Sequence, residues 1–158
     1  MKYHVKYEIE VLAFLAALLW IIACSSPLAA QENPKEWLPF EKAIELANAE
    51  KKWVMVDVWA PWCGWCLKMQ KEVYPALPDT LTDSFTFTKI NYDNPGKTFR
   101  YQGRKFLAIE LLQKFSVDTI PAIVFLSSDG EYRFHFSGFI ESPRLKQLLV
   151  EVAEHRRK

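Results

Sequence analysis

Two cysteines separated by two residues, Cys63 and Cys66, are the residues whose types and spacing most directly suggest chemistry. They follow an apolar run, Trp53 to Trp59, that is interrupted by a single acid, Asp57. We interpret this run as a strand that leads through a short turn to the start of a helix. Unpaired N–H groups and the positive end of the helix dipole favour a thiolate there. Residues three apart in a helix lie about one turn from each other, within reach of a disulfide.

A disulfide between these two cysteines would be a poor structural crosslink, because so short a ring removes little entropy from the unfolded chain. The pair is better interpreted as a bond that opens and closes. We expect Cys63 to be exposed at the helix start as the nucleophile, and Cys66 to lie one turn deeper. A thiolate that attacks a partner's disulfide forms a mixed disulfide, which the second cysteine then resolves.

Composition argues against two other classes of function. The chain has 158 residues, a net charge of +1 and 50% hydrophobic residues, with charges of both signs interspersed. We therefore expect a folded domain with no nucleic-acid footprint. The three histidines, His4, His135 and His155, are scattered without ligand spacing, so we expect no structural zinc site.

Residues 1–30 are interpreted as a leader that is either a signal peptide or a lipoprotein leader. The unbroken apolar run from Val11 to Ala23 suits a signal peptide and is short for a membrane span, which needs about 20 residues. Ile21 to Cys24 resembles a lipobox, in which Cys24 would carry lipid. Cleavage after Ala30 is the alternative, and an uncleaved anchor is the third. All three predict an exported domain, attached to the membrane only through its leader or lipid, with residues 31–36 as a polar tether.

Residues 37–158 are expected to form one α/β domain, a mixed sheet between helices. The strand over 53–59 is apolar on both faces apart from its acid, as in a central strand covered on both sides. The periodicity and turn signals predict a helix over Trp37–Ala49, a helix from Cys63 that ends near Pro75, a turn or short helix over Pro78–Ser84, a strand over Phe85–Asn91, a polar connection over Asn94–Lys105, a helix over Phe106–Phe115, strands over Ala122–Leu126 and Glu131–Phe136, and a last helix with Ser142 as N-cap.

Four segments together resemble the thioredoxin superfamily. They are Val56 to Cys66 around the cysteines, Lys89 to Gly96 as the third strand and its exit, Ile120-Pro121 as the cis-proline site, and Gly138 at the end of the last strand. The resemblance covers roughly residues 37–155 and implies the thioredoxin fold. Its Cys-Gly-Trp-Cys sequence is most similar to exported bacterial members.

Asp57 is the lone charge in a strand that should be buried, so desolvation should raise its pKa. The resemblance implies that this acid accepts the proton of Cys66 through water. The alternative is an aspartate on a wetter strand end that faces solvent. Lys89 occupies the family's lysine position, where it could tune Asp57 by charge or could simply be solvated.

The resemblance also implies a substrate-binding rim. The backbone of Ile120, before cis Pro121, would pair with an extended substrate, and Gly138 would lie beside it. Trp62 should shield the disulfide. Trp65 replaces the proline of the commonest thioredoxins and could contact substrate or simply cover the surface. The connection over 94–105 could select partners or be a tolerated insertion.

We therefore expect a monomeric, exported, periplasmic thiol–disulfide oxidoreductase that reduces cysteine pairs of exported proteins. The Cys63–Cys66 pair is its redox group, with no other cofactor, and a membrane dithiol would donate its electrons. An oxidase or isomerase is the first alternative. A metal-delivery or assembly module that uses the pair as soft ligands is the second.

Overall fold

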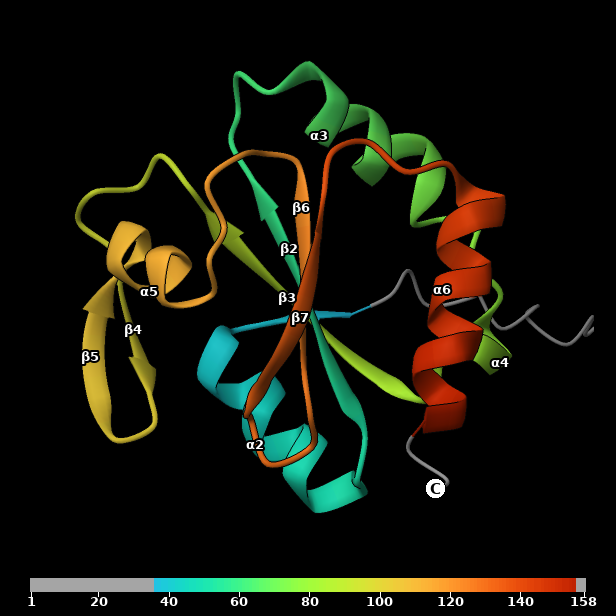
Figure 1. Ribbon diagram of the computed structural model, residues 1–158, viewed down its shortest axis with the longest axis horizontal. Helices are drawn as coiled ribbons and strands as arrows, with labels where there is room; N and C mark the ends of the chain where they lie inside the picture. Colours follow the sequence, from blue (N-terminus) through green and yellow to red (C-terminus); the bar gives the residue numbers. More distant parts are fainter. Residues whose placement is uncertain (1–35, 156–158) are drawn as a thin grey trace, which may run out of the picture. The chain divides into compact units, whose positions relative to one another are not determined.

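Strand β2 (Trp53–Trp59) is the central strand of a five-stranded sheet with the order β1-β3-β2-β6-β7 (Figure 1). It pairs with β3 (Phe85–Asn91) in parallel and with β6 (Ala122–Leu126) antiparallel. The computed structural model describes residues 36–155. The expected leader, Cys24 and residues 31–35 of the expected tether lie outside these described residues. The predicted mixed sheet is confirmed.

The remaining elements surround this strand. In chain order they are β1 (Trp37–Leu38), α2 (Phe40–Glu50), α3 (Gly64–Lys68), the π-helical segment η1 (Met69–Val73), α4 (Asp79–Thr82), β4 (Thr98–Tyr101), β5 (Arg104–Leu107), α5 (Ala108–Lys114), β7 (Tyr132–Ser137) and α6 (Ser142–His155). β1 pairs in parallel with β3, and β7 pairs antiparallel with β6.

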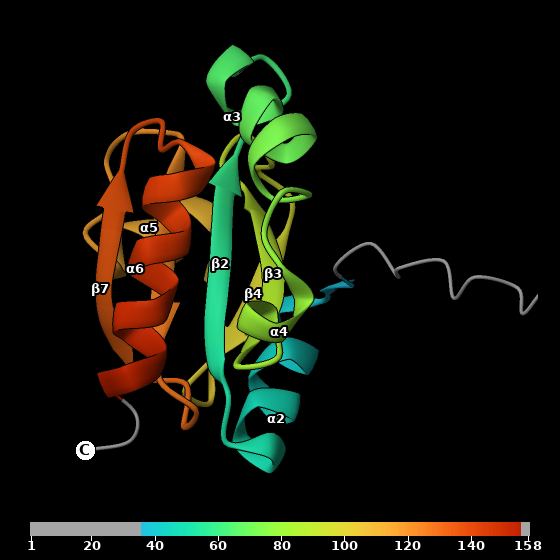
Figure 2. The ribbon, with the colours of Figure 1, turned by 90° about the vertical axis from the view of Figure 1, so that its right-hand side faces the viewer.

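Two apolar layers cover the sheet, and alternate residues of β2 contribute to each. Val54, Val56 and Val58 belong to the layer formed with α2, α5 and the β4–β5 hairpin. Met55 belongs to the other, formed with η1 and α6. Figures 1 and 2 show α2 and α6 on opposite faces of the sheet, with α3 at the end where β2 stops. The carboxyl end of β2 therefore delivers its turn to the start of a helix.

Most of the predicted elements near the cysteines are confirmed. The bounds of β2, β3 and β6 are those predicted from hydrophobicity. The helical segment that follows Cys63 ends at Val73, two residues before Pro75, which cannot donate to a helix. The short helix α4 lies within the predicted segment 78–84. β7 and α6 start within one residue of their predicted starts.

The predicted helix over Trp37–Ala49 begins too early. Trp37 and Leu38 form β1 instead, and α2 begins at Phe40. A residue before proline is driven away from helical dihedrals, and Pro39 itself is extended at φ −52° and ψ 145°. The chain therefore enters the fold as a strand on β3 before it turns into the helix.

The polar connection predicted over 94–105 is also wrong, because β4 and β5 form a hairpin there. Gln102 and Gly103 link the strands with φ of 48° and 77°, the two positive dihedrals that a tight hairpin turn requires. The helix predicted over Phe106–Phe115 consequently starts at Ala108, since Phe106 and Leu107 pair with β4. Phe99 and Tyr101 on the inner face of the hairpin are buried.

No helix within residues 36–155 is both long and apolar enough to cross a membrane.

The β4–β5 hairpin is not paired with the five-stranded sheet, and aromatic contacts pack it on the core. Tyr101 packs edge-on against Phe115 of the α5 region, with 5.2 Å between ring centroids, and it also meets Phe40 of α2 at 6.2 Å.

We predict that Tyr101→Ala lowers the free energy of unfolding by about 3 kcal/mol, because it removes a buried ring from the first apolar layer. Thr98→Ala, at an exposed position of the same strand, should change it by less than about 0.5 kcal/mol. Urea unfolding of the oxidised protein measures both. Equal, small effects would show that the hairpin is not packed on the core.

Candidate dithiol active site

Cys63 and Cys66 form a disulfide at the start of α3, with 5.2 Å between their Cα atoms. Cys63 is the N-cap residue, with extended dihedrals, and its Sγ accepts a hydrogen bond from the backbone N–H of Cys66 at 3.2 Å. This N–H belongs to the first helical turn, has no carbonyl partner within the helix and donates to the sulfur of Cys63. In the reduced protein the same donor would stabilise a thiolate at that sulfur.

The expected exposure of Cys63 is not observed in this disulfide-bonded form. Cys63 is 7% exposed and Cys66 is fully buried, so the predicted order of accessibility is right but its degree is wrong. Trp59, Tyr92 and Ile120 pack against the cluster formed by both cysteines and Ala60. In the disulfide form, the surface of Cys63 that remains open to solvent is therefore small.

Asp57 is completely buried, as predicted. It lies two residues after Met55 and therefore on the same face of β2, the face that η1 and α6 cover. Burial raises its pKa from 3.8 to about 6, against hydrogen bonds from Tyr74 and Gln70 and the charge of Lys89, which lower it. The alternative of a solvent-facing aspartate is therefore excluded. A carboxyl group with a pKa near 6 is largely ionised at neutral pH and can exchange a proton there.

Lys89 lies directly opposite Asp57 in the β2–β3 register. Its ammonium makes no ion pair with Asp57 among the described residues, and its Nζ lies 4.2 Å from the ring centroid of Trp37. Burial lowers the pKa of Lys89, while the negative charge of Asp57 acts in the opposite direction. Lys89 thus acts on Asp57 through its charge and sits against an aromatic ring instead of in bulk solvent.

Sequence reasoning missed the two side chains that contact Asp57 directly. Tyr74 donates its hydroxyl hydrogen to Oδ1 at 2.8 Å, and Gln70 donates from Nε2 to Oδ2 at 3.1 Å. Both come from the helical segment that begins at the cysteines. Gln70 and Tyr74 are four and eight residues after Cys66, a spacing that could have indicated that all three lie on one face of the helix.

The predicted substrate rim is partly assembled around the disulfide. The Ile120–Pro121 peptide bond is cis, as the resemblance implied, and Ile120 packs against the cysteine cluster. Gly138 follows β7 and donates its N–H to the carbonyl of Pro121 at 2.8 Å. Its φ of 99° is a conformation that favours glycine, which explains the residue type at this position.

The two tryptophans beside the cysteines are among the most exposed large apolar side chains of residues 36–155. Trp62 was expected to shield the disulfide, but it is 64% exposed, and its indole N–H donates to Asp93 at 3.0 Å. Trp65 is 57% exposed and packs on Phe139 with 4.9 Å between ring centroids. The Lys68 ammonium lies within 5.4 Å of the Trp65 centroid.

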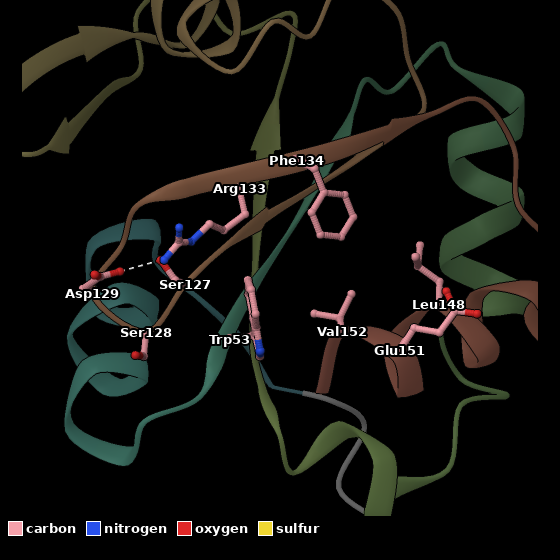
Figure 3. A pocket seen from close by; sticks show the side chains of 9 residues that line it. All are labelled: Trp53, Ser127, Ser128, Asp129, Arg133, Phe134, Leu148, Glu151 and Val152. Carbon is pink, nitrogen blue, oxygen red and sulfur yellow. Dashed lines mark hydrogen bonds between the residues drawn. The ribbon is translucent and has the colours of Figure 1, made fainter. Parts of the chain in front are cut away.

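A separate hollow of about 630 Å³ lies at the opposite end of β2 (Figure 3). It is bordered by Trp53 and Phe134 from the sheet and by Leu148 and Val152 from α6. None of the predicted site residues lines it. Within the part of the chain that the structure describes, no group of three or more His, Cys, Asp or Glu side chains is placed to hold a metal ion.

A mixed sheet with flanking helices, a Cys-x-x-Cys disulfide at a helix start and a cis-proline whose preceding residue packs against the cysteines together define the thioredoxin fold with its redox site. The family model of the thioredoxin-like domain matches residues 40–153. The chain therefore belongs to this family and is a thiol–disulfide oxidoreductase with a Cys63–Cys66 redox pair.

Several relatives carry names that refer to the same chemistry. Disulfide bond reductase DsbH of Chlamydia pneumoniae is 22% identical over 139 residues, which cover 80% of this chain and 84% of that protein. Thiol:disulfide interchange protein DsbD 2 of Pseudomonas aeruginosa is 28% identical over 93 residues, 59% of this chain but only 14% of that protein. The chain thus spans about one seventh of that relative. A solved thioredoxin-fold protein from Helicobacter pylori superposes with a TM-score of 0.59 at 17% identity, covering 68% of this chain and 73% of that one.

The raised pKa of Asp57 predicts how stability depends on pH. The folded state holds the proton of this carboxyl more tightly than the unfolded state, so the stability it gives is complete below pH 3.8 and is lost as pH rises through about 6. The loss amounts to about 3 kcal/mol, since one pKa unit corresponds to about 1.4 kcal/mol. Asp57→Asn should therefore raise the free energy of unfolding by roughly 2 kcal/mol at pH 8 and change it little at pH 4.

Urea unfolding of the oxidised protein at both pH values measures this effect. Asp83→Asn, at an exposed carboxylate, is the matched control and should follow the wild-type protein. A gain for Asp57→Asn that is the same at pH 4 and pH 8 would contradict the assigned burial and pKa.

Proposed function

We propose that this protein reduces disulfides of exported proteins through its Cys63–Cys66 dithiol. The observation that carries the proposal is Asp57, a buried carboxyl with a pKa near 6 on the sheet face covered by the helix of the dithiol. Such a group favours the resolving step because it can take the proton of the second thiol near neutral pH. The sequence supports the direction of transfer, since no histidine lies between the cysteines to over-stabilise a thiolate.

The reaction would proceed in two displacements. The Cys63 thiolate attacks one sulfur of the substrate disulfide, so the substrate S–S bond breaks, a mixed disulfide forms and the first substrate thiolate leaves. Cys66 then gives its proton to Asp57 through water, and its thiolate attacks the Cys63 sulfur. The second substrate thiolate leaves, the Cys63–Cys66 disulfide forms, and two electrons have passed to the substrate. A dithiol donor returns the pair to the reduced form.

The location and the partners belong to the same proposal. An exported protein is cut off from cytoplasmic reductants, so its electrons would come from a membrane-embedded dithiol donor. Its substrates would be exported proteins with cysteine pairs, including apocytochromes. The leader over 1–30, with either cleavage or a lipid on Cys24, would supply export and any membrane attachment. The printed name of the chlamydial relative, a disulfide bond reductase, supports the proposed direction.

The order of the two displacements predicts a trapping result. Cys66→Ser should accumulate mixed disulfides with partner proteins through residue 63, because the resolving thiol is missing. Cys63→Ser is the matched control and should accumulate far fewer. Non-reducing gel electrophoresis of cells treated with acid and alkylated detects the adducts. Recovery of none with Cys66→Ser, or of equal amounts with both variants, would refute the assigned roles.

The direction of electron transfer predicts a low reduction potential. Equilibration of the full chain with glutathione buffers, read out by alkylation of Cys63 and Cys66, should give a value below about −220 mV, in the range of reductants. A value near −120 mV, typical of strong oxidants, would overturn the proposed direction and favour the oxidase alternative. The double variant Cys63→Ser/Cys66→Ser corrects for alkylation of Cys24.

A further inference from the structure

The environment of Asp57 contains an arrangement of side chains that its role as proton acceptor does not by itself require. Each carboxylate oxygen receives a hydrogen bond, from Tyr74 to Oδ1 at 2.8 Å and from Gln70 to Oδ2 at 3.1 Å. Tyr74 is 3% exposed, and Asp57 is completely buried. A buried hydrogen bond to a charged acceptor is stronger than one between neutral groups. The carboxylate is therefore held in one orientation by the helical segment that carries the dithiol.

Helix geometry explains how a residue eight positions after Cys66 reaches this point. The segment Met69–Val73 is π-helical, and the N–H of Tyr74 donates to the carbonyl of Met69 at 3.0 Å. A π turn adds one residue to a helical turn. Because of this extra residue, Tyr74, the eighth residue after Cys66, points in the direction that the seventh residue would have in a regular α-helix. That direction is on the same face of the helix as Cys66 and Gln70.

A third element fixes the ring of Tyr74. Trp37 of β1 packs against it with 5.2 Å between ring centroids, and the same indole holds the Lys89 ammonium at 4.2 Å. The one lysine that faces Asp57 across the β2–β3 register is thus placed against Trp37 and makes no ion pair with the carboxylate. The direct partner of the carboxylate is a tyrosine hydroxyl.

We propose that Tyr74 is a positioning residue of the dithiol site: its ring packs on Trp37, and its hydroxyl orients the Asp57 carboxylate and stabilises its charged form for proton transfer from Cys66. Gln70 supplements this action from the next helical turn toward the cysteines. The inference rests on the proposed function, since it concerns the resolving step. Three groups act on Asp57: the Tyr74 hydroxyl and the Gln70 amide from the helical segment, and the Lys89 ammonium from β3. Ile123, which pairs with Asp57 on β6, is not titratable.

The order of these effects makes the proposal specific. After burial itself, the hydrogen bond of Tyr74 is the largest influence on the pKa of Asp57, ahead of the charge of Lys89 and the hydrogen bond of Gln70. Loss of the hydroxyl should therefore raise that pKa more than loss of the lysine charge would. Tyr74 itself stays protonated throughout, because burial and the neighbouring carboxylate raise its own pKa far above the working range.

The test is a stopped-flow reaction of the reduced full chain with the disulfide 5,5′-dithiobis(2-nitrobenzoate). Attack by Cys63 releases the first thionitrobenzoate, and attack by Cys66 on the mixed disulfide releases the second, so the two displacements are recorded separately. Tyr74→Phe keeps the ring on Trp37 and removes only the hydroxyl. Tyr101→Phe removes a hydroxyl that bonds the backbone of Tyr132 elsewhere in the core and is the matched control.

We expect Tyr74→Phe to shift the pH midpoint of the second release upward by about one unit, the shift that a charge-assisted hydrogen bond supports. The second release should be about fivefold slower at pH 6 and less than twofold slower at pH 8. The first release should be unchanged at both pH values. Tyr101→Phe should follow the wild type, and Lys89→Met should shift the midpoint by less than Tyr74→Phe.

Three outcomes would overturn the proposal: an unchanged midpoint in Tyr74→Phe, an equal slowing at pH 6 and pH 8, or a larger shift in Lys89→Met. Failure of the proposed function is recognised separately by the reduction potential: a potential in the range of strong oxidants would overturn the proposed direction and leave the effect of Tyr74→Phe on the second release unchanged.

Discussion

The pairing of β2 on both of its edges is the constraint on which the rest of the structure depends. It aligns the strand with β3 through Trp53 to Trp59 and with β6 through Val54 to Val58. A strand paired on both sides and covered on both faces has its backbone N–H and C=O groups satisfied by the two neighbouring strands. The carboxyl end of β2 is thereby set by its two neighbours, and the turn that follows leads to Cys63 at the N-cap of α3.

The central position of β2 also buries Asp57 and thereby raises its pKa. Because β2 is central, its one acid, Asp57, has no contact with water, and an isolated charge there would be costly. The fold offsets this cost only in part, through two hydrogen bonds and a nearby lysine, so the pKa settles at about 6 and not at its ordinary value. A carboxyl group with a pKa near 6 can change its charge close to neutral pH.

Reactivity at the dithiol is governed by access as much as by charge. Cys63 retains only 7% exposure in the disulfide form, whereas the flanking Trp62 and Trp65 are mostly exposed. Trp62 donates a hydrogen bond to Asp93 and Trp65 packs on Phe139, so each ring has one contact outside the Cys-x-x-Cys segment. The β4–β5 hairpin is packed on α2 and α5.

The sequence by itself determined the local features of this protein. Hydrophobic runs gave the bounds of β2, β3 and β6, and the spacing of the cysteines gave their place at a helix start, because these signals act over a few residues. Resemblance gave the cis-proline. Tertiary structure alone decided what depends on distant residues. Pairing with β3 drew Trp37 into a strand, an aromatic core held residues 98–107 as a hairpin, and packing left Cys63 nearly covered. The hydrogen-bond partners of Asp57 come from a helical segment with a π turn that no residue pattern predicted. Tyr74 and Trp37 meet only in the packed fold, because they are far apart in the sequence.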